Sequence, residues 1–392
     1  MIQDRNADRR RICFVATIPF AINVFLRAHI NVLRAKYDVV LVANGSAENL
    51  PGLLDTQVSF MPLKIERKIS IKSDVLALIQ LWRLFREEEF DSVHSIMPKS
   101  GLLSMIAARL AGVKFRLHTF TGQVWANKTG FSRWVLKFLD RILAKNATYI
   151  LADSHSQRDF LINNNIVASG KIGVLADGSF AGVDLERFVF SEGAREEIRR
   201  SHCIPHEAIT FIFLGRLNRD KGLADLARAF ATAAVRDPRI HLMIVGFDDG
   251  GFDEDWAKLG QQFVGRVHRA GFTDRPEKFL SAADVFCLPS YREGFGSVLI
   301  EAAAVGLPAI ASRIYGITDA VEDGVTGILH QPASDREIAE AMLLLASDDR
   351  LRRKMGDAAR SRAVEKFSEA RVTMAFFNFY QEMFSGGGGT PR

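Results

Sequence analysis

The stretch ADVFCLPSYREGFGSVLIEAAAVGLPAIA, residues 283–311, contains the pattern that decides the fold. Its apolar run Val285–Leu288 predicts a buried parallel strand, which Pro289 and Ser290 end. A helix of small residues is predicted over Val298–Val305, with Ser297 placed as its N-cap. We expect the chemistry of the protein in the loop between them, because α/β sheets bind ligands where their strands end.

This loop carries Glu293 and then Gly294 and Gly296 around Phe295, and Glu301 follows one turn into the predicted helix. Glycines let a backbone approach a ligand closely, and free amides at a helix start attract anionic or hydroxyl oxygens. The two glutamates flank that cradle. The alternative is an exposed loop glutamate beside a surface helix glutamate, with no shared role.

Seven residues separate Glu293 from Glu301, and this spacing, within EGFGS and before GLPAIAS, resembles the E-x7-E motif of retaining glycosyltransferases of family four, which have the GT-B fold. The resemblance implies that Glu293 holds hydroxyls of a donor sugar and that Glu301 holds the ribose of its nucleotide. It also implies that the sugar is oriented by the amides of Gly294, Phe295, Gly296 and Ser297.

A second motif, FLGRLNRDKGL at residues 213–223, places Arg216 at the end of a predicted strand and Lys221 just before a predicted helix. A departing diphosphate needs positive charge, and Arg offers a planar fork while Lys offers a compact charge. The motif resembles the pair that grips the nucleotide diphosphate in family four. Two solvated surface cations are the alternative.

A third motif, LHTFTGQVWANKTGFSRW at residues 117–134, has His118 at a strand end and Gly122 at a tight turn. Many strand-end histidines are structural, but family four carries a histidine here that contacts the donor sugar. HTFTGQVW resembles the subgroup with N-acetylgalactosaminyltransferases of undecaprenyl-linked glycan pathways and related capsular and O-antigen enzymes. The chain departs from many members at residues 17–21, TIPFA, where they have a Gly-Gly turn.

Strands and helices alternate along both halves of the chain, which predicts two doubly wound Rossmann-like α/β domains facing a central cleft. We expect a first, acceptor-binding domain over 1–185, a nucleotide-sugar domain over 186–366, a helix crossing back over 367–384 and a flexible tail over 385–392. Strands are expected at residues 11–16, 39–43, 58–61, 92–96, 115–119, 149–152, 209–214, 240–245, 267–271 and 285–288, and helices at 21–35, 74–88, 101–111, 131–145, 156–163, 194–201, 223–235, 277–282 and 369–384.

The chain has 392 residues, 48% hydrophobic and 25% charged, which is a globular composition. Its three cysteines, Cys13, Cys203 and Cys287, lie far apart, so we expect a reducing cytoplasm and neither a disulfide framework nor a zinc site. No signal peptide is visible, and no apolar stretch approaches the ~20 residues that a spanning helix needs. We therefore expect a soluble or at most peripheral protein.

Positive charge is concentrated in residues 1–185, where 24 Lys and Arg face 16 Asp and Glu, against 27 and 30 in the rest. On the helix expected at residues 131–145, basic residues recur every fourth position and Trp134 and Phe131 belong to an apolar arc. This pattern fits docking on an anionic membrane, with the stretch 64–86 as a second candidate. A domain helix packed on its sheet is the alternative. The basic residues are Arg133, Lys137, Arg141 and Lys145.

We expect a metal-independent retaining hexosyltransferase without a cofactor, because no D-x-D stands in a suitable position: Asp248 and Asp249 are adjacent, and Asp253 lies in a D-E-D at a helix start. Its donor is expected to be a UDP-sugar, with backbone near Phe272 reading the uracil. Its acceptor is expected to be a polyprenyl-diphosphate-linked saccharide at the inner face of the plasma membrane. No nucleic-acid motif is visible. A nucleotide-sugar epimerase and a non-catalytic membrane-recruited module are the rival classes.

Overall fold

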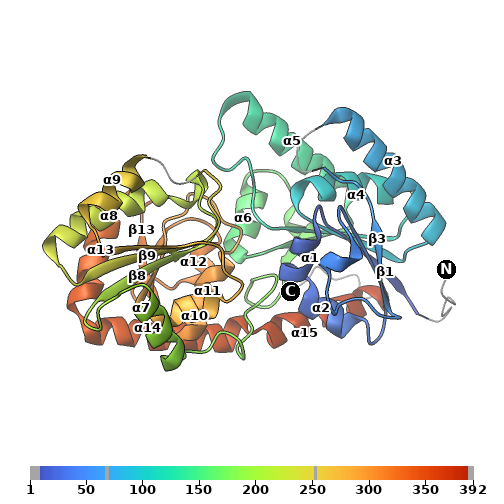
Figure 1. Ribbon diagram of the computed structural model, residues 1–392. Coiled ribbons are helices and arrows are strands. Elements are labelled where there is room, and N and C mark those ends of the chain that lie inside the picture. Colours follow the sequence, from blue (N-terminus) through green and yellow to red (C-terminus); the bar gives the residue numbers. More distant parts are fainter. Residues whose placement is uncertain (1–8, 67–69, 251–253, 387–392) are drawn as a thin grey trace. The chain divides into compact units, whose positions relative to one another are not determined.

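The computed structural model describes residues 9–66, 70–250 and 254–386 (Figure 1). The chain divides into two compact units. The N-terminal unit holds the residues up to Ala181 together with those from Arg371 onward, and the C-terminal unit is Gly182–Ala370. Each unit contains a parallel sheet of its own, which confirms the prediction of two doubly wound α/β domains. Asp253 and most of the expected tail lie outside the described residues.

The N-terminal unit contains a seven-stranded parallel sheet in the order β3-β2-β1-β4-β5-β6-β7. Residue Ile12 of β1 pairs with Val39 on one side and with Ser92 on the other, so the strand order reverses between β1 and β4. The strands are β1 Arg11–Val15, β2 Asp38–Ala43, β3 Val58–Pro62, β4 Ser92–Ile96, β5 Phe115–Phe120, β6 Tyr149–Ala152 and β7 Ile172–Val174.

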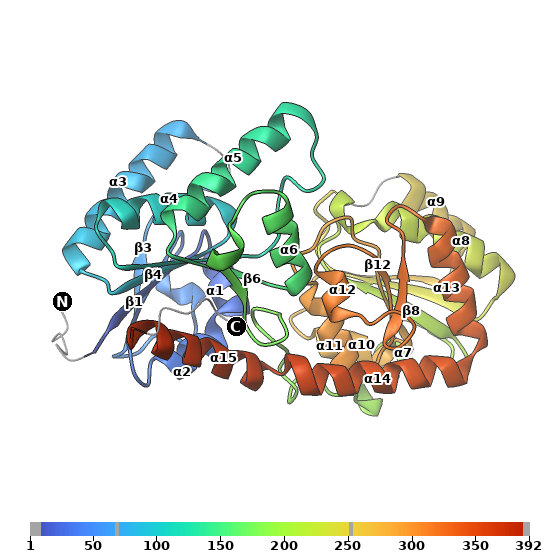
Figure 2. The same cartoon turned by 180° about the vertical axis from the view of Figure 1, so that it is seen from behind.

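Helices cover both faces of this sheet, because Ile12 to Val15 of β1 are buried on both faces. Cys13 and Val15 belong to the core under α3, α4 and α5, whereas Ile12 and Phe14 belong to the core under α1, α2 and α15 (Figures 1 and 2). The helices are α1 Pro19–Phe25, α2 Arg27–Leu33, α3 Ile71–Glu88, α4 Pro98–Leu110, α5 Gly130–Asn146, α6 His155–Asn163 and α15 Glu369–Phe384, with short 3-10 helices at Ala47–Asn49 and Ser169–Lys171.

Helix α15, the last element of the chain, is fastened to the N-terminal sheet by polar and aromatic contacts. The hydroxyl of Tyr380 lies 2.9 Å from Nδ1 of His94, whose Nε2 lies 2.8 Å from Oγ1 of Thr119. The ring of Phe376 stacks on His29 at a centroid distance of 4.3 Å. These buried contacts explain why the residues from Arg371 onward group with the N-terminal unit.

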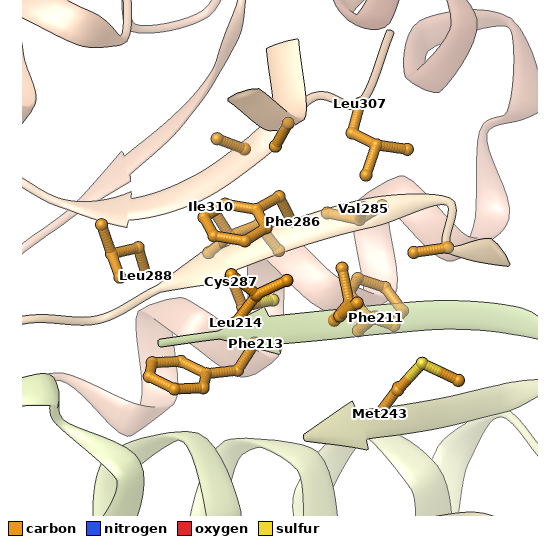
Figure 3. Packing of buried hydrophobic residues seen from close by; sticks show 14 of the residues in the cluster. Phe211, Phe213, Leu214, Met243, Val285, Phe286, Cys287, Leu288, Leu307 and Ile310 are labelled. Atoms are coloured by element: carbon orange, nitrogen blue, oxygen red, sulfur yellow. The ribbon is translucent and has the colours of Figure 1, made fainter. Parts of the chain in front are cut away.

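The C-terminal unit contains a six-stranded parallel sheet in the order β10-β9-β8-β11-β12-β13. Phe211 and Phe213 of β8 and Phe286 of β11 lie in its apolar core, which Figure 3 shows. Its elements are α7 Glu192–Ser201, β8 Ile209–Leu214, η3 Arg219–Lys221, α8 Leu223–Arg236, β9 Ile240–Val245, α9 Glu254–Gln262, β10 Val267–Ala270, α10 Pro276–Ala282, β11 Val285–Leu288, α11 Ser297–Val305, β12 Ala309–Ser312, α12 Ile317–Ala320, β13 Gly327–His330, α13 Asp335–Ser347 and α14 Asp349–Phe367.

Parts of this architecture differ from the sequence-based expectation. The single helix expected over residues 21–35 is broken at Leu26, which separates α1 from α2. The strands β7, β12 and β13 and the helices α12, α13 and α14 were not predicted. β13 begins at a glycine because its neighbour passes closely: a Cβ on Gly327 would lie 2.3 Å from the carbonyl oxygen of Ala309.

Candidate active site

The site is built where β8 and β11 end. These strands are neighbours in the C-terminal sheet and run parallel, with Val285 opposite Phe211 and Phe286 opposite Ile212. Carboxyl ends of parallel strands meet at one edge, so the turn that follows β8 lies against the loop that follows β11. The turn contains η3, and the loop leads into α11.

Backbone and side-chain contacts join the two segments. The amide of Tyr291 donates to the carbonyl of Asp220 at 2.8 Å, and the guanidinium of Arg292 contacts the Asp220 carboxylate at 2.8 Å. Gly222 has a φ of +68°, and a Cβ there would lie 1.9 Å from the carbonyl oxygen of Pro289. A glycine is therefore required for the turn and the loop to approach this closely.

Lys221 and Glu293 form an ion pair between these segments, Nζ of Lys221 contacting Oε1 of Glu293. The hydroxyl of Ser290 donates to the same oxygen at 2.8 Å. The two charged side chains are 17% and 13% exposed, so solvent screens their attraction only partly. The arrangement places one cation and one carboxylate side by side at the end of the sheet.

Arg216 lies in the same turn but is held more loosely. Its side chain is 55% exposed, and its guanidinium lies 4.0 Å from the carboxylate of Asp249. A guanidinium with this much freedom is available to an anionic ligand. Phe272 follows β10 in the same sheet and is 72% exposed, so it is open to a ligand as well.

The glycine-rich loop enters α11 in a way that differs from the expected cap. Gly296, with φ of +77°, is the N-cap, so Ser297 is the first helical residue, and no side chain caps this helix. Gly316 supports the loop from the other side, since a Cβ there would lie 2.4 Å from the carbonyl oxygen of Gly294. The amide of Leu299 donates to the carbonyl of Gly296 at 2.8 Å, and no side chain caps the amides before it, so these face the position where oxygen atoms of a ligand bind at a helix start.

Phe295 contributes only its backbone to this loop. Its side chain is 1% exposed and packs edge-on against Phe367, with ring centroids 5.2 Å apart. A direct contact between its ring and a nucleotide is therefore excluded in this arrangement, and the ring anchors the loop to the core instead.

Glu301 occupies a different electrostatic environment from Glu293. Burial raises the pKa of the Glu301 carboxyl to about 7, while the charge of Arg187 lowers it and that of Glu277 raises it. Arg187 is itself paired with Glu277 at 3.1 Å. The carboxyl therefore changes its charge close to neutral pH, where hydrogen bonding to hydroxyl groups depends on its ionisation.

His118 lies in the N-terminal unit at the end of β5, and its ring is enclosed rather than projecting from the strand. It is 1% exposed, its Nδ1 lies 2.9 Å from the hydroxyl of Ser95, and burial lowers its pKa to about 3. Gly101 permits this packing, because a Cβ there would lie 2.4 Å from Cε1 of the ring. Nε2 is buried as well and has no hydrogen-bond partner among the described residues, so a ligand can reach it only if neighbouring side chains move.

Two comparisons of the sequence identify the family. Residues 194–362, which include Arg216, Lys221, Glu293 and Glu301, match the family Glycosyl transferases group 1, and residues 22–178 match the Glycosyl transferase 4-like domain. CapM of Staphylococcus aureus, a capsular polysaccharide biosynthesis glycosyltransferase, is 30% identical over 346 residues, 88% of this chain and 90% of CapM. The chain belongs to the group 1 glycosyltransferases.

Other relatives and solved structures agree with this assignment. The UDP-Gal:alpha-D-GlcNAc-diphosphoundecaprenol alpha-1,3-galactosyltransferase of Escherichia coli is 28% identical over 354 residues, 89% of this glycosyltransferase and 90% of the relative. HepE of Anabaena, solved with UDP and glucose, superposes with a TM-score of 0.79 at 18% identity, over 95% of this chain and all of HepE. Sucrose-phosphate synthase of Thermosynechococcus elongatus superposes with a TM-score of 0.80 at 21% identity, over 96% of this chain and all of the synthase.

These structural likenesses establish the fold, which is GT-B as the E-x7-E resemblance implied. Group 1 glycosyltransferases form the retaining hexosyltransferase family four. The expectation of a retaining glycosyltransferase is thus confirmed, and the rival classes of epimerase and non-catalytic module are disfavoured.

Sequence reasoning missed three groups that shape the site of this glycosyltransferase. Ser290 was interpreted only as the end of a strand, yet it donates to Glu293. Asp220 joins the two motifs, and Arg187, which lies far upstream, acts on Glu301. Ser290 and Asp220 stood close enough in sequence to the predicted site residues to be suspected, whereas Arg187 did not. In the described part of the chain, no three His, Cys, Asp or Glu residues are grouped so that they could hold a metal ion.

Proposed function

We propose that this glycosyltransferase moves an N-acetylhexosamine from a UDP-sugar to a saccharide carried on polyprenyl diphosphate, in the assembly of a bacterial surface polysaccharide or glycan. The names of two relatives support this: CapM acts in capsular polysaccharide biosynthesis, and the Escherichia coli enzyme is named for UDP-Gal and a diphosphoundecaprenol-linked acceptor. The N-acetylated sugar is suggested by HTFTGQVW at residues 118–125. The proposed lipid carrier and nucleotide donor support a reaction at the cytoplasmic face of the plasma membrane.

The observation that carries the proposal is the Lys221–Glu293 pair at the junction of the β8 turn and the β11 loop. A carboxylate suits sugar hydroxyls, and an adjacent ammonium suits the diphosphate to which that sugar is attached. In the proposed arrangement, Glu293 and the amides from Gly294 to Ser297 orient the sugar. Lys221 and the exposed Arg216 bind the diphosphate.

The remaining donor contacts follow from the residues around this pair. Glu301 holds the ribose, backbone near Phe272 reads the uracil edge, and Nε2 of His118 contacts the transferred sugar. Burial lowers the pKa of His118 to about 3, so its imidazole is neutral near pH 7 and would contact the sugar in that form.

Retention of configuration follows from attack on the front face of the sugar. The bond between the anomeric carbon and the β-phosphate oxygen breaks, and the acceptor hydroxyl bonds to the same face of that carbon. The departing phosphate oxygen takes the proton of the hydroxyl, so no protein nucleophile is needed. Arg216 and Lys221 stabilise the negative charge that grows on the diphosphate.

The test is a panel of UDP- and GDP-sugars, each incubated with a short polyprenyl-diphosphate-linked saccharide and analysed by product mass. We expect one UDP-N-acetylhexosamine to extend the acceptor by one residue, with and without EDTA. Extension from GDP-sugars alone would overturn the donor assignment, and conversion of a UDP-sugar without acceptor would favour the epimerase. Glu293→Ala should remain folded and inactive, and full activity in that variant would overturn the role of Glu293.

A further inference from the structure

Helix α5 carries a row of exposed aromatic side chains. Phe131, Trp134 and Phe138 are 78%, 58% and 47% exposed, and their spacing of three and four residues places them on one face of the helix. Their rings stack in sequence, with centroids 5.9 and 5.7 Å apart. Large aromatic residues at this exposure are unusual on a surface that meets only water.

The basic stripe of α5, which the sequence suggested for lipid contact, is instead engaged with its own unit. Arg133 and Lys137 lie over the ring of the buried Trp125, at 5.9 and 5.2 Å from its centroid. Nε of Arg141 donates to the carbonyl of Asn165 at 2.9 Å. Three of the four basic residues therefore fasten α5 to the protein, which leaves the aromatic row as its exposed feature.

Helix α3 extends the apolar surface. Ile71, Val75, Leu76 and Ile79 are 79%, 50%, 57% and 39% exposed and recur at the spacing of one helix face. Both α3 and α5 pack on α4, and they run along the same side of the N-terminal sheet (Figures 1 and 2). Seven large apolar side chains are thus exposed on two neighbouring helices.

The charges around this surface are positive. Within residues 70–80 and 128–146, the exposed charged side chains are Lys72, Lys128 and Lys145. The two acids of these segments are held by partners, Asp74 by Lys99 at 2.6 Å and Asp140 by the indole N–H of Trp125 at 2.6 Å. An apolar surface fringed by cations complements the headgroup region of an anionic bilayer.

We propose that the exposed faces of Ile71–Ile79 in α3 and Phe131–Phe138 in α5 form a membrane-docking face that inserts into the interface of an anionic bilayer. No helix within residues 9–66, 70–250 or 254–386 has the length and apolarity to cross a bilayer, so the docking is interfacial. The proposal goes beyond the transfer reaction, because binding to lipid requires neither donor nor acceptor. Insertion is driven by the aromatic and aliphatic side chains, and the cations select anionic lipid.

The test measures how the full-length protein partitions onto vesicles of phosphatidylcholine alone and of phosphatidylcholine with phosphatidylglycerol. We expect Phe131→Ser/Trp134→Ser/Phe138→Ser to lose about tenfold or more in partitioning, because large apolar groups no longer insert. The matched control is Val235→Ser/Val264→Ser, two valines of the C-terminal unit that are 71% and 81% exposed, and it should bind like the wild type. Lys72→Gln/Lys128→Gln/Lys145→Gln should lose several-fold, and only on anionic vesicles.

Fluorescence locates the insertion independently. Trp134 is the only exposed tryptophan, since Trp82 is half-buried and Trp125 and Trp256 are buried. Lipids brominated in the acyl chain should therefore quench wild-type emission, and Trp134→Phe should bind vesicles but lose that quenching. Equal partitioning of the aromatic variant and the wild type would overturn the proposal. A second result would also overturn it: light scattering shows that the wild type is a dimer and the aromatic variant a monomer, and neither protein binds vesicles. The exposed face would then bind a second copy of the protein and not lipid.

Discussion

Lys221 and Glu293 are 72 positions apart in the sequence, yet Nζ of the lysine contacts Oε1 of the glutamate. The pair exists because β8 and β11 are adjacent strands and because Gly222 lets the two following segments touch. The charge of each member of the pair is balanced by the other. A ligand with both hydroxyl and phosphate groups offers its hydroxyls to the carboxylate of Glu293 and its phosphates to the ammonium of Lys221.

Replacing either partner should reduce transfer strongly. We expect Lys221→Met and Glu293→Gln each to lower kcat/KM by about 10²-fold or more, as removal of a preorganised polar contact does. The double variant should be little worse than either single one, since the two act as a unit. Arg219→Gln, which removes an exposed cation of the same turn, is the control in a steady-state assay. Equal losses in the control would contradict a specific role for the pair.

Gly222→Ala should separate the two motifs. Its φ of +68° is unfavourable for alanine, and its Cβ would lie 1.9 Å from a backbone oxygen that cannot move cheaply. Gly324 has φ of +74° and nothing within 4 Å of a Cβ, so Gly324→Ala isolates the conformational cost, about 1–2 kcal/mol. We expect Gly222→Ala to lower both Tm and activity well beyond this control. Similar melting curves for the two variants would show that the close approach is unimportant.

The affinity for the donor should depend on pH through Glu301. Burial raises the pKa of its carboxyl to about 7, so the group is largely protonated at pH 6 and ionised at pH 8. An ionised carboxylate accepts hydrogen bonds with both oxygens, so the KM for the nucleotide sugar should rise as pH falls from 8 to 6. Glu301→Gln should flatten this profile. Arg187→Gln should move its midpoint to higher pH, because the charge of Arg187 lowers the pKa. If the KM of Glu301→Gln depended on pH in the same way as that of the wild type, Glu301 would not be the titrating group.

Stability should depend on pH through Asp153, a buried residue of the N-terminal unit. Burial raises the pKa of its carboxyl to about 7 from an ordinary value of 3.8, although the amide of Phe180 donates to it at 2.9 Å. The folded chain therefore binds more protons than the unfolded chain between pH 4 and 7. The free energy of unfolding contributed by this group is largest below pH 4 and is lost as pH rises toward 7.

Asp153→Asn keeps an oxygen for the amide of Phe180 and removes the ionisation. We expect it to be stabilising at pH 8, by on the order of a few kcal/mol at most, and without benefit at pH 4. Chemical denaturation at both pH values measures the difference. Asp159→Asn, at an exposed carboxylate on α6, is the control and should change little at either pH. Destabilisation of Asp153→Asn at pH 8 would show that the charged form is preferred in the folded chain.

Much of the fold could be predicted because its signals are local. Apolar runs such as Val285–Leu288 and Ile209–Leu214 coincide with β11 and β8, since a strand buried on both faces must be continuously apolar. The strand β13, GILH, was missed because it has only two consecutive apolar residues, too short a run to mark a strand. The break at Leu26 was missed because nothing in the apolar pattern of residues 21–35 marks it.

The sequence by itself determined the alternation of strands and helices, the residues of the glycine-rich loop and the spacing of its two glutamates, because these are written in consecutive positions. Tertiary structure alone decided that Glu293 pairs with Lys221, that Glu301 is partly buried under the influence of Arg187, and that the basic stripe of α5 faces its own unit. Charge and burial depend on which distant segments come together, and strand order sets that. A carboxylate therefore acquires its pKa and its partner only when the sheet has formed.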